Sequence, residues 1–204
     1  MNTFDNVSII GLTGQSGAGK TTVSKIFSAN GFSVIDADGV SRDVADNSRF
    51  LNEVSEFFPD CVCDGKLERK KLAGIVFNDK KALDDYTSLI YPYITCEVFK
   101  LIRQYKSCGE SLIMLDAPTL FESGLDSICD CIVSVTAPLE LKIKRLLARD
   151  GIPYEMVYSR LSSQNDEHFF EEKSDYLISN DSTTDVLYSK TLAVIDSIKE
   201  RFNA

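Results

Sequence analysis

Short apolar segments alternate with longer amphipathic segments along much of the chain. The apolar runs have the length and composition of buried β-strands and lie at residues 7–12, 32–35, 111–115, 128–135 and 176–179. Segments between them have apolar positions at helical spacing, among them 20–30, 138–148 and 184–202. This alternation predicts an α/β fold, in which a mainly parallel five-stranded sheet is flanked by helices in three layers.

Two stretches depart from the alternation. Residues 48–105 have apolar positions at helical spacing throughout, which predicts a helical lobe. Pro92 lies inside this lobe, and because proline lacks a backbone N–H we expect it to begin or kink a helix. Residues 149–172 are polar and helical in pattern, and residues 150–153 at their start break the preceding helix and offer a hinge.

The composition and net charge of the chain disfavour several classes of function. A chain of 204 residues suits one domain, and a net charge of −9 disfavours a nucleic-acid surface. No segment approaches the roughly 20 apolar residues that span a bilayer, so we expect a soluble, cytoplasmic protein. The six cysteines lack metal-ligand spacing and are expected to be reduced thiols, with Cys129 and Cys131 packed in a strand. His168 is the only histidine, which disfavours catalysis by a histidine-centred triad.

One segment has a phosphate-binding pattern. Residues 14–21 fit G-x-x-x-x-G-K-[ST] and lie between an apolar run and an amphipathic helical segment, which is the setting of a P-loop. Glycines let such a loop curl so that its N–H groups face an anion, and the following helix adds partial positive charge. We expect a nucleoside triphosphate here, with Lys20 on the β/γ-phosphates and the Thr21 hydroxyl on Mg²⁺. The expected nucleotide-binding residues of this segment are Gly14, Gln15, Ser16, Gly17, Ala18, Gly19, Lys20, Thr21 and Thr22.

Acidic residues follow two of the expected strands. Asp36 and Asp38 come after the 32–35 run, which we expect to lie beside the strand that leads into the loop. Asp38 is the candidate to orient an acceptor hydroxyl and take its proton, although Mg²⁺ coordination through water or helix capping are alternatives. Asp116 follows the 111–115 run and resembles an acidic residue that supports Mg²⁺; a carboxylate near a helix N-terminus is an equal alternative.

The surroundings of the loop favour a small-molecule kinase over a switch or a motor. The chain has no N-K-x-D guanine signature, and its D-x-x-G at residues 36–39 follows Lys20 too closely for a switch loop. A kinase needs cations on a segment that closes over phosphates. Arg145 and Arg149 are four residues apart on one helix face and fit that role. With Lys142 and Lys144 they form the densest basic cluster of the chain, for which a solvated helix face is the alternative.

An ordered set of further motifs runs along nearly the whole chain. The loop is preceded by Gly11-Leu12-Thr13, and the acidic pair is followed by Ser41-Arg42. The remaining motifs, in chain order, are residues 64–69 with Leu72 and Phe77, residues 118–122, Arg145, residues 149–151, Gln164, and residues 175–180. In kind and in order this set resembles the dephospho-CoA kinase family.

The resemblance implies transfer of the ATP γ-phosphate to the ribose 3′-hydroxyl of dephospho-CoA. Asp38 matches the family's proposed base and, with Lys20 and Arg145, forms the expected catalytic set. The expected acceptor contacts are Asp38, Arg42, Arg69 and Glu122, and the expected further ATP contacts are Arg145 and Arg149 of the lid and Asn180 on the adenine side. A surface ion pair for Arg69 and a turn role for Asn180 remain alternatives.

The resemblance also implies the organisation of the chain and its partners. We expect one P-loop kinase domain over residues 1–204, with a core sheet at 7–47, 108–148 and 174–204, an acceptor lobe at about 48–107 and a lid at about 149–173. The expected ligands are ATP, dephospho-CoA and Mg²⁺, with neither nucleic acid nor membrane, in a monomer or weak homo-oligomer.

Four positions depart from the family's pattern. Tyr91 stands where the family has histidine, Thr119 for leucine, Lys142 for glutamine and Phe170 for lysine. Lys142 adds a lid cation and Phe170 removes one, which redistributes the charge of the lid. Two other functions remain open from the residues alone: a small-molecule kinase with a nucleoside or sugar acceptor, and a regulator that binds ATP without turning it over.

Overall fold

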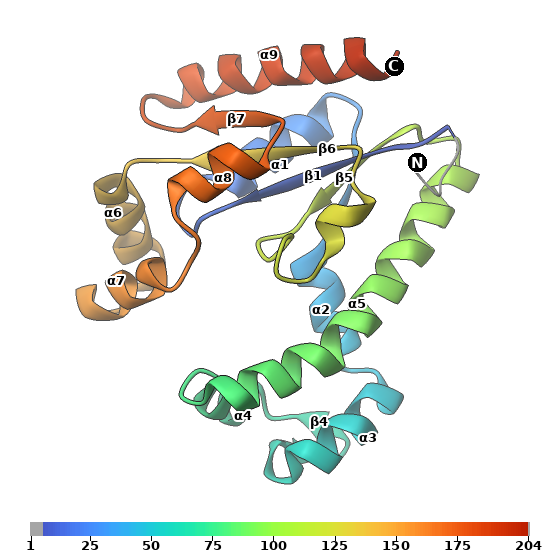
Figure 1. The fold of residues 1–204 in the computed structure, drawn as a ribbon, viewed down its shortest axis with the longest axis vertical. Coiled ribbons are helices and arrows are strands. Elements are labelled where there is room, and N and C mark those ends of the chain that lie inside the picture. The colour runs from blue at the N-terminus through green and yellow to red at the C-terminus, as the bar shows by residue number, and fades with distance from the viewer. Residues whose placement is uncertain (1–5, 204) are drawn as a thin grey trace. The chain divides into compact units, whose positions relative to one another are not determined.

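The computed structural model describes residues 6–203, which form two compact units. One unit runs up to Ile35 and resumes at Tyr105, and the other comprises Asp36–Gln104 (Figure 1). The strands of the main sheet are β1 (Ser8–Gly14), β2 (Ser33–Asp36), β5 (Leu112–Asp116), β6 (Cys131–Thr136) and β7 (Tyr176–Ser179). The helices of the first unit are α1 (Lys20–Ala29), α6 (Leu139–Asp150), α7 (Tyr154–Ser162), α8 (Glu167–Lys173) and α9 (Thr184–Phe202), with a 3₁₀ turn at Leu125–Ile128.

The five strands form one sheet in the order β2-β5-β1-β6-β7, which confirms the expected α/β fold. The pairings of β1 with β5, β1 with β6 and β6 with β7 are parallel. The expectation that β2 lies beside β1 is wrong, because β5 lies between them and aligns Asp116 with Leu12. The apolar pattern of β2 marks a buried strand but not its neighbour, and the pairing is decided by where β5 returns to the sheet.

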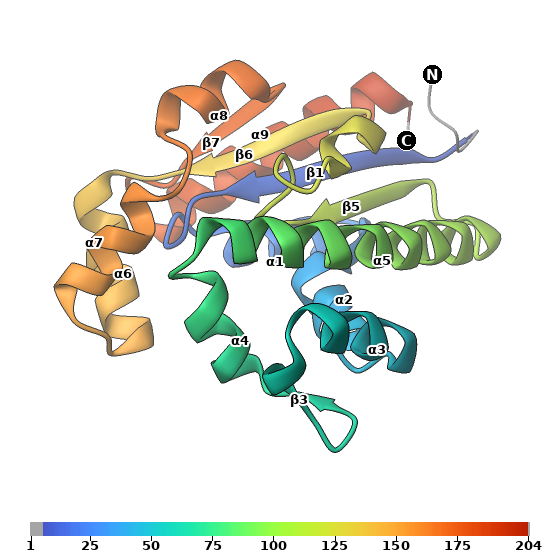
Figure 2. The same ribbon diagram turned by 60° about the horizontal axis from the view of Figure 1, so that its bottom comes forward.

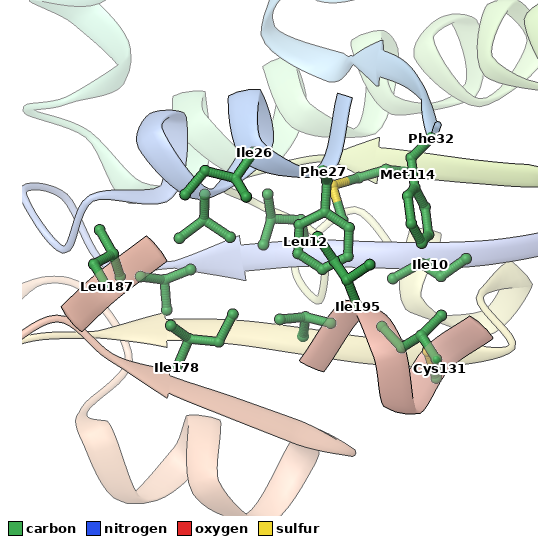
Figure 3. Packing of buried hydrophobic residues seen from close by; sticks show 14 of the residues in the cluster. Ile10, Leu12, Ile26, Phe27, Phe32, Met114, Cys131, Ile178, Leu187 and Ile195 are labelled. Atoms are coloured by element: carbon green, nitrogen blue, oxygen red, sulfur yellow. The ribbon is translucent and has the colours of Figure 1, made fainter. Parts of the chain in front are cut away.

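A hydrophobic core fills one face of this sheet. Leu12 of β1 and Met114 of β5 pack with Phe27 of α1 and Ile195 of α9, and all four side chains are buried (Figure 3). The Phe27 and Phe32 rings pack edge-on, with their centroids 4.9 Å apart. Each fully buried side chain of this size contributes roughly 1.5–3 kcal/mol. The apolar periodicity of α1 and α9 thus fixes both helices on the same face of the sheet.

Helix α8 lies on the opposite face (Figure 2). The Ser134 hydroxyl, on the face of β6 away from the core, is 2.6 Å from the hydroxyl of Ser174, which follows α8. Phe121, Phe169 and Phe170 form a cluster whose ring centroids are 5.1–6.3 Å apart. Phe170 is therefore buried. Where the family has a lysine, this phenylalanine removes a charge and also packs α8 against the segment after β5.

The second unit is mostly helical, as expected for residues 48–105, but not throughout. It contains α2 (Ala37–Val44), α3 (Ser48–Phe57), α4 (Arg69–Val76) and most of α5 (Lys80–Ser107), with a 3₁₀ turn at Pro59–Cys61. An unexpected hairpin joins β3 (Val62–Cys63) to β4 (Lys66–Leu67). Asp64 and Gly65 form its two-residue turn, with φ of 50° and 70°. An Asp-Gly pair suits a type I′ turn, so the sequence did carry a signal for this hairpin.

Helix α5 runs through Pro92, so of the two expected effects, beginning or kinking a helix, the structure excludes the first. The helix changes direction along its length in Figure 1. Phe50 of α3 packs against Tyr86 and Tyr93 of α5 at ring-centroid distances of 6.3 and 5.4 Å, and these contacts hold α5 against α3 within the unit.

Candidate active site

The phosphate-binding loop has the strand–loop–helix setting that the sequence predicts. It leaves β1 at Gly14 and ends at Gly19, whose φ of 108° places it in a left-handed conformation just before α1. Lys20 is the first residue of α1, and Thr21 and Thr22 are exposed in its first turn. The exposed start of a helix behind a glycine-rich loop is a ready site for a phosphate group. In Figure 1, β1 points toward α6 and α7, so the loop lies at the end of the sheet that these helices flank.

Two neighbouring segments press against the loop and explain two of its glycines. A Cβ at Gly17 would lie 2.9 Å from the carbonyl oxygen of Lys142 in α6, and a Cβ at Gly19 would overlap the side-chain amide of Asn180 after β7. Asn180 donates from Nδ2 to the carbonyl of Ala18 at 2.7 Å, and its backbone N–H donates to the carbonyl of Thr136. Asn180 is thus a structural neighbour of the loop in addition to its predicted adenine role.

Arg145 lies between α6, the loop and Asn180. Its guanidinium donates to the carbonyls of Gly17 and Ala18 at 3.2 and 3.4 Å. It also donates to the backbone and side-chain oxygens of Asn180, both at 3.2 Å. Because these are carbonyl contacts, Arg145 holds the loop through its carbonyl oxygens and uses none of the loop's N–H groups, which are the groups that an anion would need.

Lys20 forms an ion pair with Asp116 at the end of β5. Both side chains are mostly buried, with exposures of 16% and 12%. Asp116 is delivered there because β5 pairs with β1, and the next residue, Ala117, donates its N–H to Leu12 at 3.0 Å. The carboxylate therefore lies beside the lysine that the sequence assigns to the β/γ-phosphates.

The segment between α7 and α8 contacts the loop directly. Gln15 donates from Nε2 to the carbonyl of Asn165 at 2.7 Å. The Ser16 N–H donates to Gln164 Oε1 at 3.0 Å, and Gln164 Nε2 returns a bond to the Ser16 hydroxyl at 3.1 Å. Asn165 Nδ2 donates to Glu122 Oε1 at 3.0 Å, which connects the predicted acceptor residue Glu122 to the same segment.

The basic cluster of α6 contains both buried and exposed side chains. Lys142 is only 5% exposed and donates to Gln15 Oε1, so a solvated helix face is the wrong interpretation for this residue. Arg149 is exposed and forks onto the carboxylate of Asp150 at 2.6 and 3.0 Å, and Arg160 of α7 joins the same carboxylate at 3.0 Å. These bonds fix the junction between α6 and α7.

In the second unit, the residues after β2 form the start of α2. The N-cap of this helix is Asp36, whose carboxylate accepts from the N–H of Asp38 at 3.0 Å. Asp38 is therefore in the first turn, with an exposed side chain, and does not itself supply the cap. Arg42, one turn on, pairs with Asp36 at 3.2 Å.

Arg42 and Arg69 line one pocket in this unit. The Arg69 guanidinium donates to the carbonyl of Arg42 at 3.0 Å and lies 3.7 Å from the carboxylate of Asp46. The pocket has a volume of about 200 Å³, and its wall combines the two guanidinium groups with apolar surface from Leu72, Val76 and Tyr86. Two cations beside apolar surface suit a ligand that carries both phosphate and aliphatic groups.

The described residues hold no cluster of three or more histidine, cysteine or carboxylate side chains that suits a metal ion. All six cysteines are free thiols, and burial raises the pKa of Cys131 to about 12, so this thiol is protonated at neutral pH. Cys129 lies just before β6, not in it. Within residues 6–203 we find no helix with the length and apolar character to cross a membrane.

Sequence reasoning missed the contacts that join the loop to its neighbours. In the sequence, Gln164 stands out only as part of a motif, and Lys142 only as a member of the basic cluster and a departure from the family's pattern. Their partners Ser16 and Gln15 are 148 and 127 residues away in the chain, so no local pattern signals the pairing. The position of Asp116 at the end of a strand is visible in the sequence, but its pairing with Lys20 depends on the strand order.

The family model and the curated relatives agree on one family. A family model described as dephospho-CoA kinase matches residues 8–185. The chain is 33% identical to a dephospho-CoA kinase of Fusobacterium nucleatum over 195 residues, which covers 95% of this chain and 100% of the relative. Among solved structures, it resembles TT1252 from Thermus thermophilus (TM-score 0.84, 27% identity) and a dephospho-CoA kinase from Campylobacter jejuni (TM-score 0.70, 25% identity). Both comparisons cover 94% of this chain and 97% of the solved chain.

Proposed function

The chain belongs to the dephospho-CoA kinase family and therefore phosphorylates dephospho-CoA with ATP in coenzyme A biosynthesis, and we propose how its residues carry out this transfer. The proposed acceptor atom is the ribose 3′-hydroxyl oxygen. The observation that carries the proposal is the family match across residues 8–185, which includes an intact phosphate-binding loop with Lys20 at the start of α1.

ATP is proposed to bind with its phosphates against the loop. The N–H groups of the loop and the start of α1 attract the phosphate oxygens, and Lys20 stabilises the charge that develops as the γ-phosphate leaves. Arg145 keeps the loop in shape by donating hydrogen bonds to carbonyls of the loop. Together with Asn180 it borders the proposed adenine side. Arg149, at the α6–α7 junction, is the proposed lid cation.

The residues at the end of the loop fit Mg²⁺. The Thr21 hydroxyl and the Asp116 carboxylate are oxygen donors of the kind that this cation prefers, and both flank Lys20. Thr21 would hold the ion and Asp116 would support it. When bound, Mg²⁺ neutralises part of the triphosphate charge and orients the γ-phosphate.

The acceptor is proposed to bind in the second unit. Arg42 and Arg69 would bind its phosphate groups, and the apolar wall of their pocket would contact its aliphatic part. Asp38 would orient the ribose 3′-hydroxyl and accept its proton as the oxygen forms a bond to the γ-phosphorus and the bond to ADP breaks. The exposed first turn of α2 leaves the Asp38 carboxylate accessible for this role. Glu122 is proposed to contribute to the acceptor side through the segment at Asn165.

We further propose a cytoplasmic enzyme that is a monomer or a weak homo-oligomer. Sedimentation of the purified protein at several concentrations tests the oligomeric state.

The experiment that tests the function measures conversion of dephospho-CoA to coenzyme A by the purified protein with ATP and Mg²⁺. Lys20→Ala and Asp38→Asn should each lose turnover, and chelation of Mg²⁺ should abolish it reversibly. The matched controls are Lys25→Ala in α1 and Asp43→Asn in α2, which change exposed residues of the same helices. If Asp38→Asn retains the wild-type kcat, Asp38 is not the base.

A further inference from the structure

A buried lysine lies against the phosphate-binding loop. Lys142 belongs to α6, is 5% exposed, and donates a hydrogen bond from its ammonium to the side-chain oxygen of Gln15. Gln15 is itself only 7% exposed. The backbone of Lys142 also touches the loop, because its carbonyl oxygen lies where a Cβ of Gly17 would need space. Helix α6 and the loop are therefore in contact through both main chain and side chain.

The environment of this ammonium does not favour a charge. Among the described residues it forms an ion pair with no carboxylate, and its hydrogen-bond partner is a neutral amide. Burial lowers the pKa of Lys142, and the more distant carboxylate of Glu167 offsets this only in part. A buried cation without a paired anion costs free energy, and a well-packed apolar residue of the same volume is often more stable. Stability alone does not explain a lysine here.

The lysine determines how the Gln15 amide is oriented. An ammonium group only donates hydrogen bonds, so it must face the amide oxygen of Gln15. The NH₂ group of Gln15 then faces the other way, where it donates to the carbonyl of Asn165 at 2.7 Å. Beside this contact, the Ser16 N–H and hydroxyl bond Gln164, the neighbour of Asn165. Without Lys142, only the carbonyl of Asn165 would hold the Gln15 amide in this orientation.

We propose that Lys142 is a positioning residue for the kinase reaction, which orients Gln15 so that the segment at residues 164–165 docks on the phosphate-binding loop. Lys142 acts through Gln15 and does not touch the reacting atoms. The docked segment and α6 hold the loop from two sides. The Ser16 N–H is taken up by Gln164, and the other N–H groups of the loop keep the arrangement that receives the triphosphate. This role rests on the proposed function, because it concerns how ATP is held.

The proposal predicts a specific kinetic signature. A loop that is pre-arranged for phosphates helps the ground state and the transition state equally, so its loss should raise KM for ATP and leave kcat unchanged. Loss of one hydrogen bond from a charged donor should weaken ATP binding roughly tenfold or more. KM for dephospho-CoA should change less than KM for ATP, because this network reaches the acceptor side only indirectly, through the hydrogen bond from Asn165 to Glu122.

The test compares Lys142→Met with wild type, and with Lys144→Met as a matched control in an exposed position of the same helix. Binding of ATP is measured by calorimetry, both KM values and kcat by turnover, and the unfolding temperature by calorimetric scanning. Hydrogen exchange of the peptide that covers residues 160–170 reports docking of the segment. Gln15→Ala and the double variant complete a cycle, since a residue that acts through Gln15 should add nothing once Gln15 is gone.

In Lys142→Met we expect about tenfold weaker ATP binding and faster exchange of the 160–170 peptide, with an unfolding temperature that does not fall. The single and double variants should lose ATP affinity equally. Wild-type ATP affinity in Lys142→Met, or additive losses in the double variant, would overturn the proposal. Should Lys142→Met fail to fold, Gln15→Ala decides alone, because it must show the same weaker binding and faster exchange.

These readouts separate the positioning role from the kinase reaction. Direct ATP binding tests Lys142 even if the wild type does not convert dephospho-CoA, in which case the proposed function fails and the positioning role stands. If the wild type converts dephospho-CoA and Lys142→Met binds ATP normally, the positioning role fails and the proposed function stands.

Discussion

Lys20 and Asp116 form an ion pair although 96 residues separate them in the chain. Lys20 starts α1 directly behind the phosphate-binding loop, and Asp116 ends β5, the strand that pairs with β1. A lysine that is to stabilise phosphate charge is thus held beside a carboxylate that suits a supporting role for Mg²⁺. The pair joins the two electrostatic elements that the proposed reaction needs.

Replacement of Asp116 by asparagine should lower kcat by roughly 10²-fold, the cost of losing one group that organises transition-state charge. Lys20 also loses its counter-charge in a mostly buried position, so the unfolding temperature should fall by a few degrees. Steady-state kinetics and thermal unfolding measure both effects. Asp126→Asn, in the 3₁₀ turn after β5, is the control, and an unchanged kcat in Asp116→Asn would contradict the assignment.

Replacement of Gly19 by alanine should prevent ATP binding and destabilise the fold. Its φ of 108° strains any other residue by about 1–3 kcal/mol, and the new Cβ overlaps Asn180. Gly74 in α4 is the matched control, because a Cβ there meets nothing within 4 Å, and Gly74→Ala should stabilise by about 0.5–1 kcal/mol. Denaturant unfolding compares the two, and equal effects would be inconsistent with the crowding at Gly19.

Replacement of Arg145 by methionine should weaken ATP binding and lower stability together. The guanidinium makes four hydrogen bonds that tie the loop to Asn180, and each bond from a charged donor contributes about 1.5–3 kcal/mol when buried, less when half-buried as here. Arg103→Met in α5 changes a cation outside this network and should have neither effect. Calorimetry gives both quantities, and wild-type ATP affinity in Arg145→Met would show that the loop does not depend on these bonds.

Replacement of Asp150 by asparagine should change how stability depends on pH. The hydrogen bonds and charges of Arg149 and Arg160 hold the pKa of the Asp150 carboxyl below its usual range. A carboxyl with a lowered folded-state pKa stabilises fully above its unfolded-state pKa of about 4, and this contribution is lost as pH falls through the folded-state pKa. The wild type should therefore be more stable than the variant at neutral pH, with the difference vanishing in acid. Unfolding temperatures from pH 7 downward measure this, with Asp84→Asn as an exposed control, and a constant difference would refute the pairing.

Replacement of Arg69 by methionine should raise KM for dephospho-CoA about tenfold and leave KM for ATP unchanged, because one charged contact to the acceptor is lost. Arg49→Met, in an exposed position of α3, should change neither constant. Initial-rate kinetics with each substrate varied distinguish the two. A change confined to KM for ATP would place Arg69 outside the acceptor site.

The sequence by itself determined the type of fold and the chemistry of the loop. Strands, α1, α6 and α9 follow from apolar periodicity, because burial of one face acts on residues three or four apart in a helix and two apart in a strand. The phosphate-binding loop follows from a short run of glycines with Lys20 and Thr21, because its shape and its charge are both local properties. The ordered motifs along the chain are also specific enough to indicate the family without any tertiary contact.

Only the tertiary structure decided which distant residues meet. The place of β5 between β2 and β1, the pairing of Lys20 with Asp116 and the packing of Phe170 on Phe121 each join segments far apart in sequence. The burial of Lys142 beside Gln15 is the clearest case, because in sequence this lysine belongs to a basic cluster that resembles a solvated helix face. Charge and periodicity describe a side chain's own helix, whereas its partner depends on how helices and loops pack, and that information is not local.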